Sequence, residues 1–245
     1  MTKFGSVLIQ LATVDSTNNY AANLIQQGSC QDGSVIMADY QTKGRGQRGN
    51  SWQSVSSENL MFSIAFRPRL TIEEQIRLSW YTAIIWQQCL RRFGLDTQIK
   101  WPNDIYVKGQ KLGGILIEQQ LKGAQLDWAI IGCGINVNQA PELQGATSIL
   151  DQTAQKFKPL TVLIEYLDLL NGQQDLLYGD FLKLKVLFEE GLFLKDQIQH
   201  FQKMDGSQFE GRILGVNERG ELLLETDNSV QTFANQELRF LSLGT

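Results

Sequence analysis

The chain has 245 residues, of which 42% are hydrophobic and 20% charged, values typical of a folded protein with a sizeable core. Its net charge of −4 argues against a general binder of polyanions, which usually carries a basic face. It contains a single histidine, His200, so a metal site built from several histidines is excluded. A hydrolytic triad would have to use that histidine, and no nucleophile motif stands near it.

The three cysteines, Cys30, Cys89 and Cys133, are widely spaced and form no CxxC pair. Neither a zinc knuckle nor a disulfide framework is therefore expected. No run of about 18 apolar residues occurs, and the N-terminal segment lacks the apolar core and cleavage site of a secretion signal. We expect no membrane span and, by default, a cytoplasmic location.

The first third of the chain predicts alternating strands and helices. A helix is expected after Asp15, with Ser16 or Thr17 as its cap and Gly28 as its end. Short apolar runs bounded by turn residues predict strands on both sides of that helix. Their ranges are 6–15, 34–41 and 60–68.

The clearest helix begins at a capping box formed by Thr71 and Glu74, carries apolar residues at helical spacing, and ends at Gly94. A meander of short strands and tight turns is predicted next. Its strands cover 98–107, 111–121 and 127–138. The helical pattern returns at about 159–190, with a break near Gly172.

After about residue 195 the pattern changes to short β-like runs separated by turn residues. Such a pattern predicts a small, separate all-β unit. We therefore expect two domains, covering residues 1–192 and 193–245.

Residues 43–52, KGRGQRGNSW, combine three glycines and two arginines in a loop. Glycines let successive backbone amides form a concavity that binds anions, and arginines add geometrically specific hydrogen bonds to carboxylate or phosphate. The loop therefore suits an anionic small molecule. A solvated surface loop or a short RGG-like patch is the alternative. It is not a Walker loop, because no GK[ST] follows.

Three further segments are moderate signals when taken singly. In KWPND (100–104) Pro102 stiffens the backbone and gathers a lysine, an aromatic ring, an amide and a carboxylate, although a plain turn is the simpler reading. KLGGILIE (111–118) and GCGINVN (132–138) place glycines inside strands, which marks close approach of a ligand or backbone, or a bulge.

Five segments in this order and at this spacing are similar to those of biotin–protein ligases. They are DSTN (15–18), YQTKGRGQRGNSW (40–52), KWPND (100–104), KLGGILIE (111–118) and GCGINVN (132–138). The chain thus resembles this family over nearly its whole length. The resemblance implies an α+β fold: a mixed β-sheet flanked by helices, forming the class II synthetase-like catalytic domain shared with lipoate ligases, followed by a small C-terminal β-barrel.

The resemblance also implies a two-step reaction. Biotin and Mg²⁺·ATP first give biotinoyl-5′-AMP and pyrophosphate, and the ε-amine of a carrier-protein lysine then attacks the mixed anhydride. The usual acceptor is the biotin carboxyl carrier protein of acetyl-CoA carboxylase. We expect ATP and Mg²⁺ as cofactors, biotin and this carrier as partners, no DNA or membrane partner, and a monomer or homodimer.

The resemblance assigns roles to residues of this chain. Lys100 would lie between carboxylate and phosphate, with Arg45 as a second catalytic cation and Asp104 as the acceptor of the amine proton. Residues implied for biotin are Ser16, Thr17, Asn18, Gln41, Gly44, Arg45, Gly46, Gln47, Trp52 and Lys100. Residues implied for ATP and the adenylate are Arg45, Arg48, Lys100, Asn103, Lys111, Gly114 and Asn136. No metal ligands are assigned.

The chain departs from the family pattern at several positions. Gln47 stands where the loop commonly has a second arginine, and Asn50 replaces a further arginine of some relatives, so we expect weaker retention of the adenylate. Lys158 replaces a late-helix arginine and receives no role. The first strand begins close to Met1, which leaves no room for the DNA-binding domain of some relatives, and no repressor function is expected.

Three rival readings remain. The first is a lipoate or octanoate ligase, against which Gln41 and the polar residues of DSTN favour the ureido ring of biotin. The second is a nucleic-acid module that uses GRGQRG, disfavoured by the acidic composition. The third is an inactive protein of the same fold, disfavoured by the presence of Lys100 and Arg45.

Overall fold

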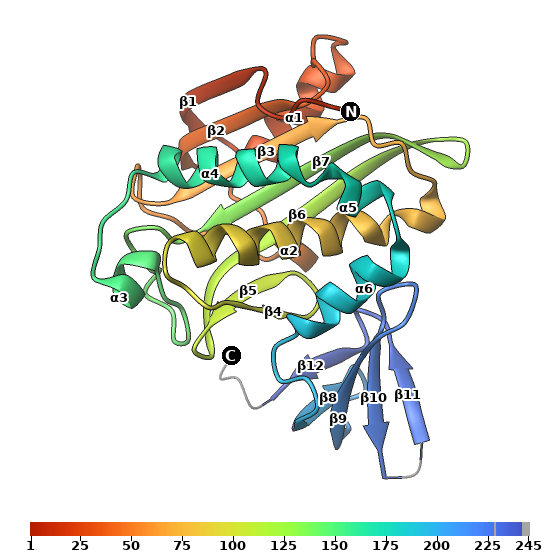
Figure 1. The fold of residues 1–245 in the computed structure, drawn as a ribbon. Helices are drawn as coiled ribbons and strands as arrows, with labels where there is room; N and C mark the ends of the chain where they lie inside the picture. The colour runs from red at the N-terminus through yellow and green to blue at the C-terminus, as the bar shows by residue number, and fades with distance from the viewer. Residues whose placement is uncertain (228, 242–245) are drawn as a thin grey trace.

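The computed structural model describes residues 1–227 and 229–241, with the side chain of Arg48 excepted. Two β-sheets organise the chain (Figure 1). The larger sheet has the strand order β1-β2-β3-β7-β6-β5-β4, and the smaller one has the order β11-β10-β9-β8-β12. The predicted mixed sheet flanked by helices is confirmed.

The seven strands of the larger sheet follow the predicted apolar runs closely. They are β1 (Leu8–Val14), β2 (Ser34–Gln41), β3 (Leu60–Phe66), β4 (Gln98–Lys100), β5 (Asp104–Val107), β6 (Gln110–Lys122) and β7 (Gln125–Ile135). Strands β1 and β2 pair in parallel, and the other neighbours pair antiparallel. The single strand expected at 98–107 is two strands joined by a turn, because Pro102 has no N–H to donate to a ladder.

Six α-helices accompany the sheets within the described residues. They are α1 (Thr17–Gln26), α2 (Ile76–Arg92), α3 (Ile149–Thr153), α4 (Pro159–Gly172), α5 (Gln174–Tyr178) and α6 (Phe181–Glu190). The predicted capping box is present, since the backbone N–H of Thr71 donates to Glu74 Oε2 at 3.0 Å. It starts a 3₁₀ turn (Ile72–Glu74) that leads into α2. The predicted break near Gly172 separates α4 from α5.

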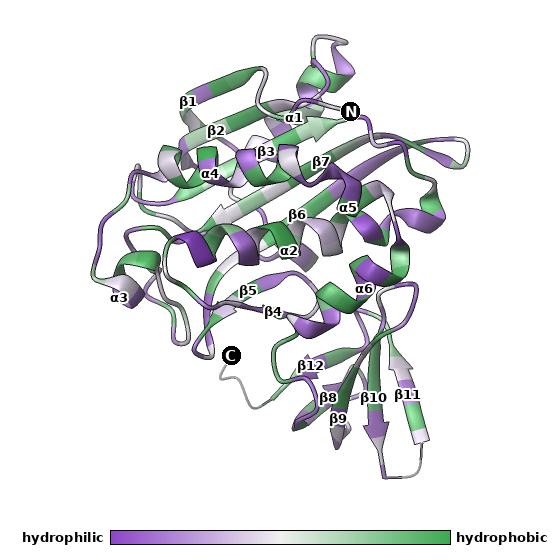
Figure 2. Ribbon diagram, in the orientation of Figure 1, coloured by the Kyte–Doolittle hydropathy of each residue, from purple (hydrophilic) through white to green (hydrophobic). Residues whose placement is uncertain are grey.

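Helices cover both faces of the larger sheet. Neighbouring residues of a strand point to opposite faces, so Val35 belongs to the large core beneath α2 and α4, whereas Ile36 packs in a smaller cluster with Ala21 of α1. Figure 2 shows green and purple segments along α2, and the middle of this helix is covered on all sides, because every residue from Trp80 to Trp86 is buried. The core therefore divides into two layers, and α1 covers one of them.

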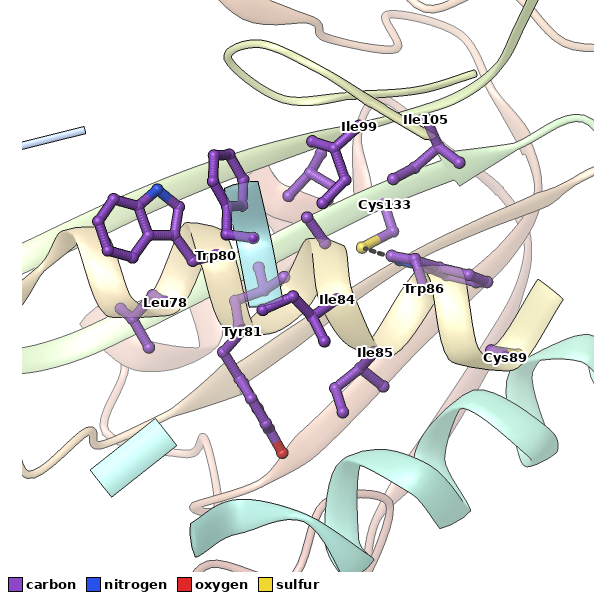
Figure 3. Packing of buried hydrophobic residues seen from close by; sticks show 14 of the residues in the cluster. Leu78, Trp80, Tyr81, Ile84, Ile85, Trp86, Cys89, Ile99, Ile105 and Cys133 are labelled. Atoms are coloured by element: carbon purple, nitrogen blue, oxygen red, sulfur yellow. Dashed lines mark hydrogen bonds between the residues drawn. The ribbon is translucent and has the colours of Figure 1, made fainter. Parts of the chain in front are cut away.

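Helix α2 supplies the centre of the large core, shown in Figure 3. Its Trp80, Tyr81 and Trp86 are almost fully buried, Trp80 by stacking on Phe188 of α6 and Tyr81 by contact with α4. The indole N–H of Trp86 donates to Cys133 Sγ at 3.3 Å, which ties α2 to β7. Among the described residues, every helix is too short or too polar to cross a membrane.

The smaller sheet, called the C-terminal sheet below, is formed by the last strands of the described chain. Its strands are β8 (Ile198–Lys203), β9 (Gln208–Val216), β10 (Leu222–Thr226), β11 (Ser229–Phe233) and β12 (Leu238–Phe240). The small all-β unit predicted from the sequence is present. Its outer strands β11 and β12 are unpaired with each other in the described part, so the expected barrel is an open five-stranded sheet. The predicted domain division at residue 192 stays a prediction.

Candidate active site

A cavity of about 790 Å³ lies between the larger sheet, the glycine loop and the C-terminal sheet. It brings together most of the predicted site residues, which come from four separate segments, and Gly132 and Gly134 of the fifth segment also line it. Those lining it are Ser16, Thr17, Asn18, Gln41, Arg45, Gly46, Gln47, Trp52, Lys100, Asn103, Asp104, Lys111 and Gly114. Asn50, one of the departures from the family pattern, also lines it.

Three predicted site residues are placed differently. Gly44 is buried behind the cavity wall, where its carbonyl accepts from the N–H of Trp52 at 2.9 Å. Asn136 is buried just beyond β7 and donates to the carbonyl of Thr147 at 3.0 Å, outside the lining residues. The side chain of Arg48 lies outside the described atoms, and its backbone belongs to a 3₁₀ turn (Gln47–Gly49).

Glycines in β7 make the floor of this cavity. A Cβ at Gly132 would lie 2.2 Å from Asn18 Oδ1, and one at Gly134 would lie 2.4 Å from the indole of Trp52. Both contacts are far too short for any side chain. The predicted close approach at these glycines therefore brings the start of α1 and the glycine loop directly onto the sheet.

The start of α1 forms an uncharged polar pole of the cavity. Gln41 Oε1 accepts from the backbone N–H and the hydroxyl of Thr17, at 2.8 and 3.1 Å. Ser63 Oγ lies 2.7 Å from Thr17 Oγ1 and 2.6 Å from Asn18 Oδ1. These partners fix the orientation of side chains that face the cavity. Ser63 was missed by sequence reasoning, because a serine within an apolar strand gives no local signal of a site.

Arg45 extends from the glycine loop to strand β6, where it forms an ion pair with Glu118. Its Nη2 donates to Glu118 Oε1 at 2.6 Å and its Nη1 to Glu118 Oε2 at 3.3 Å. Nη1 also donates to Asn19 Oδ1 at 2.7 Å. Asn19 in turn donates to Asp15, and this hydrogen bond lowers the pKa of the Asp15 carboxyl. The loop arginine is thus held by the protein itself.

Lys100 lies between two aromatic rings on the opposite side of the cavity. Its Nζ is 5.4 Å from the ring centre of Tyr106 and 5.1 Å from that of Phe240 in β12. Cation–π contacts of this kind hold an ammonium group while leaving it charged. Burial raises the pKa of Tyr106, so its phenol stays neutral beside the lysine at ordinary pH.

Lys111 and Asp104 form an ion pair across the β5–β6 hairpin, with Nζ and Oδ1 2.7 Å apart. Strand pairing places them together, because Asp104 stands opposite Gly114 and Tyr106 opposite Lys111. The Lys111 ammonium also lies 6.0 Å from the ring centre of Trp52. Asn103 holds the preceding turn through a 2.7 Å hydrogen bond from its Nδ2 to the carbonyl of Ile115.

The C-terminal sheet completes the cavity wall, which the sequence did not predict. Asn235, Arg239 and Phe240 line the cavity. Asn235 Nδ2 donates to Gln47 Oε1 at 2.8 Å, so a residue near β12 contacts the glycine loop. The indole of Trp101 donates to the carbonyl of Gly220 at 2.8 Å. No local pattern signals these contacts, since they depend on how two distant segments pack.

The charge of the cavity contrasts with that of the whole chain. Its described lining side chains include four basic residues, Arg45, Lys100, Lys111 and Arg239, and one acidic residue, Asp104. The chain as a whole has a net charge of −4. A cavity with this excess of positive charge suits a ligand that carries several negative charges.

Cysteine chemistry is not supported at this site. Cys133 lines the cavity, but burial raises the pKa of its thiol to about 12. The reactive thiolate is therefore scarce at neutral pH. The buried indole N–H of Trp52 has no hydrogen-bond partner among the described residues, as expected where a polar ligand atom is to be accommodated.

Comparison with known proteins gives consistent matches. Residues 11–136 match the model of the biotin/lipoate A/B protein ligase family. The bifunctional ligase/repressor BirA of Bacillus subtilis is 30% identical over 242 residues, which cover 96% of this chain and 74% of that protein. The biotin–[acetyl-CoA-carboxylase] ligase of Mycobacterium tuberculosis is 31% identical over 160 residues, covering 60% of this chain and 57% of that protein.

A solved structure of the Aquifex aeolicus biotin protein ligase in complex with biotin and ATP superposes with a TM-score of 0.74 and 25% identity. The match covers 96% of this chain and 98% of that one. The similarity therefore includes both the larger sheet and the C-terminal sheet.

Proposed function

The chain belongs to the biotin/lipoate A/B protein ligase family, and from that premise we propose that it activates biotin with ATP and transfers the biotinyl group to a carrier-protein lysine. As a member of this family it is a ligase. The observation that carries the proposal is the cavity itself. It joins an uncharged polar region at α1 to a region whose lining has more basic than acidic side chains, in a chain that is acidic overall.

The basic region suits the first half-reaction. A carboxylate oxygen of biotin attacks the α-phosphorus of ATP, and the bond to the departing pyrophosphate breaks. Two anions must approach each other, so positive charge at the reacting atoms lowers the barrier. We assign this role to Lys100 and Arg45, which line the same cavity. Backbone amides of the glycine loop would hold the carboxylate.

The polar pole suits the ureido ring of biotin. Ser16, Thr17, Asn18 and Gln41 offer hydroxyl and amide groups without net charge. The hydrogen bonds of Thr17 with Gln41 and of Asn18 with Ser63 fix three of these side chains before a ligand binds, which reduces the entropy lost on binding. The indole of Trp52 would cover the apolar part of the ligand.

The donor set at the cavity fits Mg²⁺ that arrives with ATP. Residues 1–227 and 229–241 contain no cluster of three or more His, Cys, Asp or Glu able to hold a metal by themselves. Mg²⁺ is usually held by one or two carboxylates together with substrate phosphates, and Asp104 is the acidic side chain in the described lining. When bound, the ion neutralises phosphate charge.

In the second half-reaction the lysine ε-amine of the carrier attacks the carbonyl carbon of the adenylate. An amide bond forms, the bond to AMP breaks, and the attacking amine nitrogen loses one proton while keeping the other as the amide N–H. We propose Asp104 as the acceptor of that proton. Its carboxylate lies at the cavity wall and is paired with Lys111 at 2.7 Å, which holds it in place.

We further propose the biotin carboxyl carrier protein of acetyl-CoA carboxylase as the acceptor, in the cytoplasm, with the ligase acting as a monomer or homodimer. The proposal includes no repressor function, in keeping with the acidic net charge of −4. A sequence-specific shift of DNA mobility at physiological salt would contradict that part.

Transfer can be tested directly by mass spectrometry. The full chain, biotin and Mg²⁺·ATP are incubated with the carrier domain, and with a carrier whose acceptor lysine is replaced by arginine. We expect one biotinyl group on the unaltered carrier, only when ATP is present, and none on the altered one. A carrier that stays unmodified, or that receives another acyl group in preference to biotin, would contradict the proposal.

A further inference from the structure

Glu118 is a carboxylate beside the cavity to which no role has been assigned. It lies on β6 four residues beyond Gly114, so both side-chain positions belong to the same face of the sheet as the cavity floor. Its side chain is outside the cavity lining and is 33% exposed. It touches two residues that do line the cavity, Asn18 and Arg45.

The contact with Asn18 helps to set which way that amide faces, together with the carbonyl of Leu116, which accepts from the same Nδ2 at 3.4 Å. Glu118 Oε2 accepts from Asn18 Nδ2 at 2.8 Å. A carboxylate accepts hydrogen bonds and donates none, so the nitrogen of the amide must face Glu118. The oxygen of Asn18 then lies on the other side, 2.6 Å from Ser63 Oγ and against Gly132. Asn18 is thereby fixed with its acceptor on the side of the cavity floor.

The contact with Arg45 positions the charge of the glycine loop. Both oxygens of Glu118 accept from the guanidinium, and Asn19 accepts a further hydrogen bond from it. These bonds come from Nη1, which donates to both Asn19 and Glu118, and from Nη2. Nε and the second N–H of Nη2 remain on a side chain that lines the cavity. A bidentate pair of this geometry restricts the rotation of a side chain that is otherwise long and flexible.

We propose that Glu118 is a positioning residue for acid activation, holding the ureido-recognising amide of Asn18 and the charge of Arg45 in one fixed geometry. This inference rests on the proposed function. It predicts that selectivity for the acid and its activation depend on one carboxylate that touches neither substrate.

A purely structural ion pair would behave differently. Pairs as exposed as this one contribute little to stability. Loss of the Glu118 charge should therefore leave the melting temperature almost unchanged, while a loss of positioning should raise KM for biotin. The two explanations are therefore distinguished by comparing the change in KM for biotin with the change in melting temperature.

Glu58 provides a matched control. It pairs with Lys156 at 3.0 Å, its side chain is 32% exposed, and it lies outside the cavity lining. Glu118→Gln and Glu58→Gln each remove one carboxylate charge from a comparable ion pair. In Glu118→Gln the new amide also turns an N–H donor toward the donors of Asn18 or Arg45, which Glu118→Asp avoids.

The experiment measures exchange of labelled pyrophosphate into ATP by the full chain with biotin and with octanoate, together with melting temperatures. For Glu118→Gln we expect KM for biotin to rise about tenfold and the preference for biotin over octanoate to fall by a similar factor, as when a hydrogen bond to a charged group is lost. Glu118→Asp should recover part of both, and Glu58→Gln should match the wild type.

The experiment distinguishes failure of the proposed function from failure of the positioning role alone. Wild-type exchange that is independent of any acid would contradict the proposed function and this inference with it. Wild-type exchange driven by biotin, with unchanged KM and selectivity in Glu118→Gln, would overturn the positioning role alone. Losses in Glu118→Gln that only follow a lowered melting temperature would overturn it as well.

Discussion

The two sides of the cavity are built in different ways. On the recognition side, formed by Thr17, Asn18 and Gln41, the polar groups already have protein partners at hydrogen-bond distance. On the activation side, formed by Lys100, Asp104 and Lys111, the charges are held by aromatic rings and by one ion pair.

The two sides depend on different parts of the molecule for their geometry. The recognition side is assembled from α1 and from neighbouring strands of the larger sheet. The activation side includes Phe240 of β12, so its geometry depends on how the C-terminal sheet packs. We therefore expect changes to the first side to affect acid binding, and changes to the second to affect turnover.

The largest effect on activity is expected when Lys100 is removed from the activation side. Lys100→Ala should slow acid-dependent pyrophosphate exchange at least about 30-fold, or ~2 kcal/mol, because positive charge at the reacting phosphate is removed. The effect should fall on kcat. Lys156→Ala, which removes an exposed lysine outside the cavity, serves as the control. Unchanged turnover in Lys100→Ala would remove Lys100 from the catalytic residues.

Gly132→Ala should distort the recognition side and is expected to have the next largest effect, a loss of biotin affinity. The added Cβ would lie 2.2 Å from Asn18 Oδ1, so Asn18 must move. Overpacking of this kind costs about 1.5 kcal/mol, and we expect biotin affinity measured by calorimetry to fall about tenfold with a smaller change in kcat.

Gly172→Ala is a suitable control for that variant, because a Cβ at the end of α4 meets nothing within 4 Å. It should leave biotin affinity unchanged. An equal loss of affinity in both variants would mean that the effect of Gly132→Ala is not a local one.

A smaller effect is expected where the C-terminal sheet supports Lys100. Phe240→Leu keeps an apolar side chain but removes the ring that faces the ammonium 5.1 Å away. Loss of a cation–π contact of about 0.5–1 kcal/mol should lower kcat about threefold and leave biotin affinity unchanged.

Phe209→Leu provides the comparison, because Phe209 faces Lys203 at 5.2 Å in the same sheet but lies outside the cavity lining. If both phenylalanine variants have the same kcat, the C-terminal sheet does not act on the activation side through Phe240.

Local patterns were enough to predict much of the fold. The capping box at Thr71 and the glycines at β7 are local signals with a direct structural meaning, and the structure contains both features. The split of strand 98–107 was missed, although the missing N–H of Pro102 is also visible in the sequence. The open C-terminal sheet could not be distinguished from a barrel, because closure depends on pairing between its outer strands.

The site residues also fall into those that local motifs predict and those that only tertiary packing brings together. Residues gathered by short motifs, such as Ser16 and Lys100, lie in one cavity, whereas Asn136 lies outside its lining. Glu118 was missed even though it follows Gly114 at the even spacing that defines one face of a strand. Phe240 carries no such signal, since its approach to Lys100 follows from the packing of segments far apart in the chain.

The most direct test of the account is exchange of labelled pyrophosphate into ATP by the wild-type chain, run with biotin, lipoate, octanoate and no acid. We predict exchange that depends on biotin and is weak or absent with the other acids, because the polar pole at α1 suits a ureido ring. Exchange driven by lipoate or octanoate, or exchange with none of the acids, would contradict the account.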